Sequence, residues 1–133
     1  MSVYVDTSAF YAIVDSSDAN HQTAAATWQR LLRDKEELWT SSFALTETLA
    51  LFHNRLGTDV VRRFVDDNLP AVRIHWVDWA MYSTALGAML ATPGRRGPSL
   101  ADCTGLEVMR LLRTRRIFAY DQHYANLGLD VLG

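Results

Sequence analysis

The sequence has little cysteine, little lysine and no long apolar run, and each scarcity excludes a class of protein. Cys103 is the single cysteine, which excludes a disulfide framework or a cysteine-based zinc site and fits a reducing compartment. No apolar segment is long enough to cross a bilayer and no basic leader precedes one, so we expect a cytoplasmic protein without membrane contact. The length predicts a single domain over residues 1–133.

Charge excludes a uniformly basic nucleic-acid clamp, because the net charge is -2 and Lys35 is the one lysine. Arginines are nevertheless concentrated between residues 93 and 116, where six of them stand against two acids. These arginines are Arg95, Arg96, Arg110, Arg113, Arg115 and Arg116. Arginine binds phosphate as a fork, so this window is a hint of phosphate binding. Taken alone, the window favours the alternative of a solvated helix face.

Short apolar runs alternate with longer segments of helical period. The short runs predict strands at residues 3–5, 38–40, 72–76 and 117–120, with 131–132 as a possible fifth. Apolar residues at helical spacing predict helices at 9–13, 24–32, 45–56, 60–65, 79–90 and 100–112. This alternation indicates an α/β fold with a parallel sheet covered on both faces. Ligands of such folds bind beyond the carboxyl ends of the strands.

Four carboxylates lie where that edge is expected. Asp6 and Asp121 directly follow strands, whereas Glu47 and Asp102 lie early in helices with apolar residues one turn away. Each has a structural alternative: a helix cap for Asp6 and Asp121, a capping box for Ser99 and Asp102, and an ordinary exposed acid for Glu47. Carboxylates gathered in one crevice repel each other, and a divalent cation relieves the repulsion. A set of oxygen ligands favours Mg²⁺ or Mn²⁺ over Zn²⁺.

Four short motifs, in this order and on this pattern of elements, resemble the acidic motifs of PIN-domain ribonucleases. They are Val5-Asp6-Thr7-Ser8, Thr46-Glu47-Thr48-Leu49, Ser99-Leu100-Ala101-Asp102 and Tyr120-Asp121-Gln122-His123-Tyr124. The resemblance covers nearly the whole chain, and the spacing and length are most similar to VapC-like toxins. It implies a PIN-like three-layer α/β/α fold with a central, mostly parallel sheet, and a single PIN-like nuclease domain over residues 1–133.

The resemblance also implies an activity and a site. The activity is Mg²⁺- or Mn²⁺-dependent endoribonuclease cleavage of RNA phosphodiester bonds, by the toxin of a toxin-antitoxin pair that inhibits translation and growth. Asp6, Asp102 and Asp121 are expected to bind metal, and Glu47 to hold a second ion or the attacking water; all four acids are expected to be catalytic. The residues expected to contact RNA phosphate are Thr7, Ser8, Arg95 and Arg96, with helix capping as the alternative for Thr7 and Ser8.

Two residues depart from the family pattern. Ala119 stands where many members carry Thr or Ser two residues before the last Asp, so a hydroxyl that would orient water or phosphate is missing. Tyr124 replaces the usual Phe, which we interpret as a mild change.

The four histidines form no metal-binding pattern and are expected on helix surfaces or in the core.

The expected partners are RNA in a single-stranded or loop region, a cognate antitoxin and a second copy of the chain in a homodimer. An extended or helical antitoxin segment would fill the crevice and place an Arg or Lys among the carboxylates. The four tryptophans, at positions 28, 39, 76 and 79, are expected in the core, with Trp79 or Tyr82 as a candidate dimer face.

Other functions remain open at this stage. Within the same family, the alternatives are a housekeeping RNA-processing PIN nuclease and a catalytically inactive PIN-like binding module. Haloacid-dehalogenase-like phosphatases need Asp-x-Asp, but Ser8 follows Thr7 here. Response-regulator receivers need a lysine at a late strand end, and no lysine follows Lys35. Neither of these two phosphoryl-transfer classes is favoured.

Overall fold

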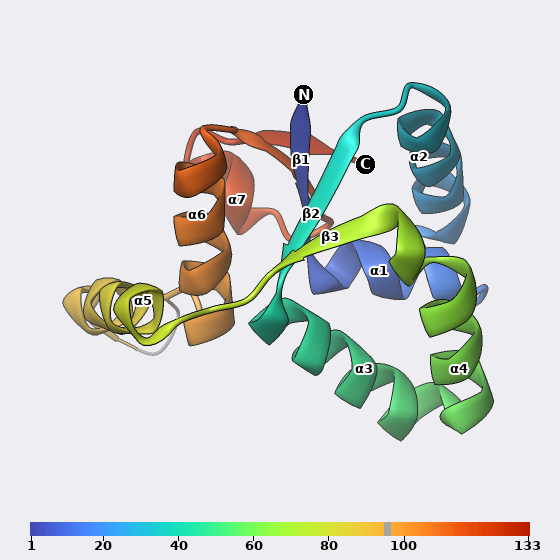
Figure 1. The fold of residues 1–133 in the computed structure, drawn as a ribbon, viewed down its shortest axis with the longest axis horizontal. Helices are drawn as coiled ribbons and strands as arrows, with labels where there is room; N and C mark the ends of the chain where they lie inside the picture. Colours follow the sequence, from blue (N-terminus) through green and yellow to red (C-terminus); the bar gives the residue numbers. More distant parts are fainter. Residues whose placement is uncertain (95–96) are drawn as a thin grey trace.

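The predicted strands form one parallel sheet. In the computed structural model, which describes residues 1–94 and 97–133, the strand order is β3-β2-β1-β4-β5 and each neighbouring pair is parallel (Figure 1). The strands are β1 (Ser2–Val5), β2 (Glu37–Ser41), β3 (Val72–His75), β4 (Arg116–Phe118) and β5 (Asp130–Leu132). The predicted fold class is confirmed, and so is the possible fifth strand. β4 ends two residues earlier than predicted, so Ala119 and Tyr120 lie in the turn that leads to Asp121.

Helices fill the segments between the strands. They are α1 (Thr7–Val14), α2 (His21–Arg33), α3 (Ser42–Leu56), α4 (Thr58–Asp67), the short 3-10 helix η1 (Leu69–Ala71), α5 (Trp79–Ala91), α6 (Leu100–Leu112) and α7 (His123–Asn126). The turn between α3 and α4 is made by Gly57, whose φ of 94° lies in the left-handed region that glycine tolerates best. The predicted end of a helix at this glycine is confirmed.

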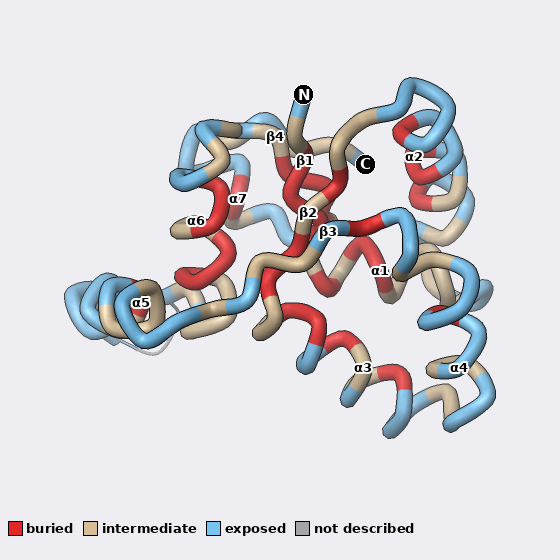
Figure 2. The backbone as a smooth tube through the Cα atoms, viewed as in Figure 1, coloured by how far each residue is buried: buried red, intermediate tan, exposed pale blue. Residues whose placement is uncertain are grey.

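Alternate side chains of the central strands enter two separate cores. Val3 and Val5 face the side covered by α1 to α4, whereas Tyr4 faces α6 and α7. The molecule therefore has three layers, with the sheet between two groups of helices (Figure 1). Figure 2 shows that the sheet and the helix faces turned toward it carry much of the buried surface. The three-layer α/β/α prediction is confirmed.

Three phenylalanines hold α1, α3 and α4 together. The rings of Phe10 and Phe64 meet edge to face with centroids 5.3 Å apart, and those of Phe52 and Phe64 do so at 5.1 Å. All three side chains are buried. Edge-to-face pairs add about 0.5–1.5 kcal/mol each beyond the burial of their area. This cluster fixes α3, and with it the candidate acid Glu47.

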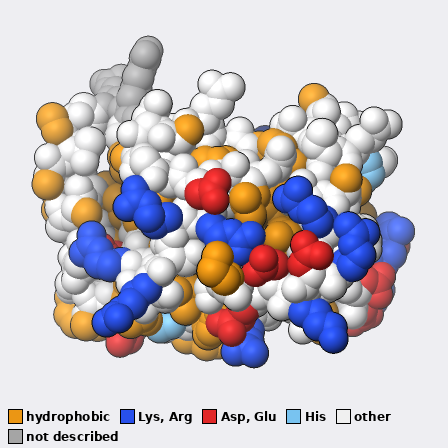
Figure 3. Space-filling model, turned by 90° about the horizontal axis from the view of Figure 1, so that it is seen from above, with side chains coloured by type: hydrophobic (Ala, Val, Ile, Leu, Met, Phe, Trp, Pro, Cys, Tyr) orange, Lys and Arg blue, Asp and Glu red, His pale blue; other side chains and the backbone are white. Residues whose placement is uncertain are grey.

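Charged side chains at the edge where the strands begin are paired with each other. Arg116 lies 3.1 Å from Glu36, and Arg73 lies 3.6 Å from Glu37. Figure 3, seen from the top of Figure 1, shows basic and acidic side chains side by side on this face. Elsewhere in the arginine-rich window, Arg110 pairs with Glu107 at 3.5 Å. Several of these arginines therefore have roles within the fold.

The tryptophan prediction is wrong for two of the four residues. Trp28 is buried and Trp39 is half-buried, but Trp76 is 71% exposed and Trp79 is 74% exposed. Trp79 is exposed because α5 packs against α6 and lies away from the sheet, so most of the surface of α5 is open, as Figure 2 shows. Trp76 lies in the connecting segment between β3 and α5. Among the described residues, no helix has the length and apolar character to span a membrane.

Candidate active site

Asp6 is held at the carboxyl end of β1 by its neighbours on two sides. Its backbone N–H donates to the carbonyl of Phe118 at 3.0 Å, which joins the ends of β1 and β4. Its Oδ2 accepts from the Ser8 N–H at 3.1 Å and from the Ser8 hydroxyl at 2.6 Å. That hydroxyl in turn accepts from the Tyr120 N–H at 3.0 Å. Asp6 is thus the N-cap of α1, and the capping alternative is compatible with a place in the site.

Asp102 is fixed in the same way at the start of α6. Its Oδ2 accepts from the Ser99 N–H at 3.0 Å, and its own N–H donates to the Ser99 hydroxyl at 3.1 Å, which completes the predicted capping box. Its other oxygen, Oδ1, accepts from the Tyr124 hydroxyl at 2.9 Å. Capping thus orients this carboxylate and leaves one oxygen facing the site.

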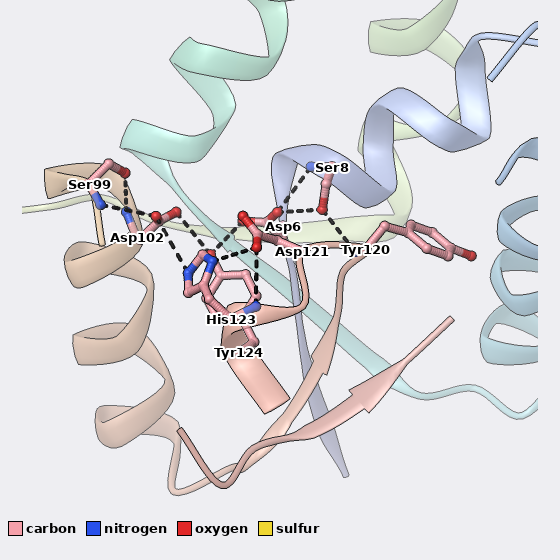
Figure 4. Close-up of polar contacts among 8 residues, drawn as sticks. All are labelled: Asp6, Ser8, Ser99, Asp102, Tyr120, Asp121, His123 and Tyr124. Carbon is pink, nitrogen blue, oxygen red and sulfur yellow. Dashed lines mark hydrogen bonds and ion pairs between the residues drawn. The ribbon is translucent and has the colours of Figure 1, made fainter. Parts of the chain in front are cut away.

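Tyr124 joins the two acids. Its hydroxyl also lies 3.0 Å from Asp6 Oδ1, so a single phenolic oxygen contacts both carboxylates (Figure 4). The side chain is 2% exposed and packs among residues of α6 and β4. Burial raises the pKa of Tyr124, and the charges of Asp6 and Asp102 raise it further, so the hydroxyl remains protonated and donates.

Asp121 reaches the other acids through His123. Its Oδ1 accepts from the His123 N–H at 3.2 Å and lies 2.5 Å from His123 Nδ1. The other ring nitrogen, Nε2, lies 3.7 Å from Asp102 Oδ2 and is buried without a hydrogen-bond partner in the described part of the chain. The imidazole therefore stands between the two carboxylates (Figure 4). β1 and β4 are adjacent in the sheet, as predicted, but Asp121 lies three residues after the end of β4 and contacts His123.

Glu47 completes the group from α3. Burial raises the pKa of Glu47, and the negative charges of Asp102 and Asp6 raise it further. Burial likewise raises the pKa of Asp6, with a contribution from Asp102, while hydrogen bonds from Ser8 and Tyr124 act in the opposite direction. The charge of Asp102 thus acts on both Asp6 and Glu47, so the three acids, which come from three separate segments, lie near each other. Such repulsion is what a bound cation would neutralise.

The carboxylate oxygens of the four acids are suitable ligands for a divalent cation, but in this structure they do not surround a single point as the ligands of a bound ion do. Within residues 1–94 and 97–133, no three Asp, Glu, His or Cys side chains are close enough to hold one ion as they stand. The Tyr124 hydroxyl and the His123 ring lie between the carboxylates instead. The four acids offer oxygen ligands, the set that Mg²⁺ and Mn²⁺ prefer.

The predicted RNA-contacting residues have different surroundings. The Thr7 hydroxyl is buried, donates to the Ala44 carbonyl at 3.3 Å and accepts from the Thr48 hydroxyl at 3.0 Å. The Ser8 hydroxyl donates to Asp6 Oδ2 and accepts from the Tyr120 N–H. Arg95 and Arg96 lie outside the described residues. The hydroxyls of Thr7 and Ser8 thus stabilise the site from within.

His123 and Tyr124 have larger roles in the site than their sequence positions predict. The sequence predicts His123 on a helix surface or in the core and Tyr124 as a mild replacement of Phe, whereas both contact the acids. The signal available was their position two and three residues after Asp121, on the short helix α7 that turns back toward β1. The hydroxyl of a buried tyrosine usually has a hydrogen-bond partner, and the partners of Tyr124 are the carboxylates of Asp6 and Asp102.

Gly105 allows α6 to approach β1 closely. A Cβ at this position would lie 2.8 Å from the Tyr4 hydroxyl oxygen and 2.9 Å from two carbons of the Tyr4 ring. Tyr4 is the residue of β1 two positions before Asp6, and Gly105 lies one turn after Asp102 on α6. This contact sets how near the two acids come to each other.

Two comparisons with known proteins agree with the fold. The family model described as PIN domain matches residues 3–129. A crystal structure of VapC20 of Mycobacterium tuberculosis, described as a sarcin-ricin loop cleaving toxin, superposes with a TM-score of 0.82 at 28% sequence identity. The match covers 98% of this chain and 99% of that one. No curated protein matches the chain.

These matches confirm the predicted fold and the predicted class, an RNA-cleaving enzyme related to VapC toxins. PIN-domain nucleases generally use divalent metal ions, in agreement with the carboxylates gathered at the edge of the sheet. From its fold, its acidic site and a family match over nearly its full length, the chain belongs to the PIN domain family.

Proposed function

We propose that this chain is a Mg²⁺- or Mn²⁺-dependent endoribonuclease, with Asp6, Glu47, Asp102 and Asp121 as metal-binding and catalytic residues. One observation carries the assignment. Asp6 and Asp102 each turn one oxygen toward a common point, while Glu47 lies close enough for both charges to raise its pKa. Residues 1–133 would form one nuclease domain, which the family match over 3–129 supports.

When bound, the ion supplies an activated water and neutralises charge on the scissile phosphate. Asp6, Asp102 and Asp121 would hold it, with Ser8 and Ser99 fixing the first two carboxylates through their Oδ2 atoms. Glu47 would position the attacking water and accept its proton, a role that a raised pKa favours at neutral pH. Arg95 and Arg96 remain the proposed phosphate contacts, whereas the hydroxyls of Thr7 and Ser8 are engaged by hydrogen bonds within the protein. Water as the nucleophile predicts products with a 5'-phosphate and a 3'-hydroxyl.

The activity is tested with purified protein and a structured RNA that exposes single-stranded loops. We expect cleavage with Mg²⁺ or Mn²⁺, none after treatment with EDTA, and 5'-phosphate ends detected by sequencing of the products. Ca²⁺ is a useful control, because it is a larger ion with looser geometry and should support cleavage poorly. Metal-independent cleavage, or ends with a 2',3'-cyclic phosphate, would contradict the proposal. RNA binding without cleavage would favour the inactive binding module.

We further propose that the protein acts in the cytoplasm as the toxin of a toxin-antitoxin pair. The likeness to VapC20, described as a toxin, supports this over a housekeeping nuclease. The antitoxin would place an Arg or Lys among the carboxylates, and the charge repulsion at Asp6 and Glu47 favours such a group in the absence of metal. The target would be a single-stranded or loop region of RNA, because bases must be unstacked to be read.

The proposed homodimer would use the exposed face of α5 and α6. Trp79 stacks on Tyr82 with ring centroids 5.6 Å apart, and Leu90 and Leu111 are also exposed. A groove of about 350 Å³ runs between the two helices and contains the Glu107–Arg110 pair. A two-fold axis through this face would bury the apolar side chains against their own copies.

Sizing tests the dimer. We expect the wild-type protein to elute as a dimer at micromolar concentration and Trp79→Lys to elute as a monomer, because a desolvated charge at the centre of an interface is costly. Leu127→Lys is the matched control, since Leu127 is also an exposed apolar residue but follows α7. A monomeric wild-type protein would rule out the dimer. A dimeric Trp79→Lys variant would show that the dimer interface lies on another face.

A further inference from the structure

Tyr124 brings together the two oxygens of the site that capping leaves free. In Asp6 the Oδ2 atom is held by Ser8, and in Asp102 the Oδ2 atom is held by the Ser99 N–H. The Oδ1 atoms of both acids lie within hydrogen-bond distance of the same hydroxyl, at 3.0 and 2.9 Å, and share its single proton. Each carboxylate therefore has one oxygen fixed by its own helix and the other directed by Tyr124.

The hydroxyl is itself held in place by packing. The Tyr124 ring is buried among α6 and β4, against Val108, Met109 and Ile117, and it lies 4.3 Å from the His123 ring centroid. A hydroxyl on a buried ring has little rotamer freedom to lose, so it holds its two acceptors at low entropic cost. Phenylalanine would fill the same space and leave both Oδ1 atoms without this donor.

We propose that Tyr124 is a positioning residue that pre-organises the metal site by directing Asp6 Oδ1 and Asp102 Oδ1 to one point. The inference rests on the proposed function, since it concerns the affinity of the same acids for a divalent ion. A carboxylate oxygen has two lone-pair directions, so accepting from Tyr124 leaves one direction for a metal. Hydrogen bonds to metal-binding carboxylates fix ligand orientation, and their loss typically costs about 10–100-fold in metal affinity.

The test compares Tyr124→Phe with the wild-type protein in Mn²⁺ titrations by calorimetry without RNA. We expect Mn²⁺ to bind about 10-fold more weakly to the variant, with an unchanged melting temperature in EDTA. Cleavage by the variant should require a correspondingly higher Mn²⁺ concentration and recover at saturation, because the four acids are still present. Tyr11→Phe is the matched control, since the Tyr11 hydroxyl interacts with Asp15 and Arg55 rather than with the four acids, and this variant should bind Mn²⁺ like the wild type.

The outcomes separate this inference from the proposed function. Equal Mn²⁺ affinity in Tyr124→Phe and wild type would overturn the positioning role while the nuclease assignment stands. Tighter binding by the variant would also overturn it, because the hydroxyl would then compete with the ion. If the wild-type protein takes up no Mn²⁺, the proposed function itself fails. Tyr124→Phe could also lower the melting temperature in EDTA, and the Mn²⁺ titration is then repeated at a lower temperature, at which the variant is folded. A wild-type Mn²⁺ affinity under those conditions would assign Tyr124 to packing and overturn the inference.

Discussion

Asp6→Asn is expected to abolish metal-dependent RNA cleavage and to leave the fold intact. The amide retains one oxygen for the donors of Ser8, so the cap of α1 survives, but it removes a charged metal ligand. Losing one charge-stabilising group from a pre-organised site typically costs on the order of 10²–10³-fold in rate, and we expect at least that loss here. Cleavage rates at saturating Mn²⁺, together with circular dichroism of both proteins, provide the measurement.

The same substitution has a predictable effect on stability in metal-free buffer. Because burial and the Asp102 charge raise the pKa of Asp6 in the folded protein, stability from this group is present at low pH and is lost as pH rises through that pKa. Asparagine does not ionise, so Asp6→Asn should melt at the higher temperature by a margin that grows from about pH 4 toward neutrality. Added Mn²⁺ should raise the melting temperature of the wild-type protein alone. A variant that melts below the wild type at neutral pH would contradict this account of the site.

Gly105→Ala is expected to destabilise the protein and to reduce cleavage together. The new Cβ would lie within 2.9 Å of the Tyr4 ring, which is buried and cannot move aside easily, so α6 must shift away from β1. Overpacking of this kind costs about 1–3 kcal/mol. The shift also separates Asp102 from Asp6, and a displacement near 1 Å in an active site costs on the order of 10²-fold in rate. Denaturant unfolding and cleavage assays measure the two effects.

Gly87→Ala is the matched control for this substitution. Gly87 is also in the interior of a helix, but a Cβ there meets nothing within 4 Å. Alanine is the better helix former, so this variant should gain about 0.5–1 kcal/mol and retain its activity. If the two variants behave alike, the close approach at Gly105 does not set the position of α6.

The sequence was sufficient to predict a parallel sheet and the alternation of strands and long helices along the chain, because the spacing of apolar residues reflects which side chains are buried. Val3 and Val5 face one core and Tyr4 faces the other, as the alternation of a strand predicts. The apolar residues at helical spacing in α3 and α6 end near the capping residues of these helices, so the local sequence pattern agrees with the fold. Trp76 and Trp79 show the limit of this reasoning. An apolar residue is predicted to be buried, and nothing local indicates that α5 packs mainly against α6 and lies apart from the sheet.

The acids could be predicted from the sequence as a group, but not their connections. Strand ends and helix starts indicated where Asp6 and Asp102 would lie. The hydroxyl of Tyr124 lies between Asp6 and Asp102, and the ring of His123 lies between Asp102 and Asp121. Both arrangements depend on the packing of α7 near α6, a long-range contact that no local pattern encodes. The close approach at Gly105 is missed for the same reason, since its partner Tyr4 is 101 positions away along the chain.

The pairing of β1 with β4 also determines when during synthesis the site can exist. Asp6 leaves the ribosome early, yet its backbone is fixed by Phe118, and Tyr124, which joins it to Asp102, comes later still. A growing chain that has not reached β4 lacks the central strand pair, and one that has not reached Tyr124 lacks the hydroxyl between the acids. The site is therefore assembled only after almost the whole chain has been made.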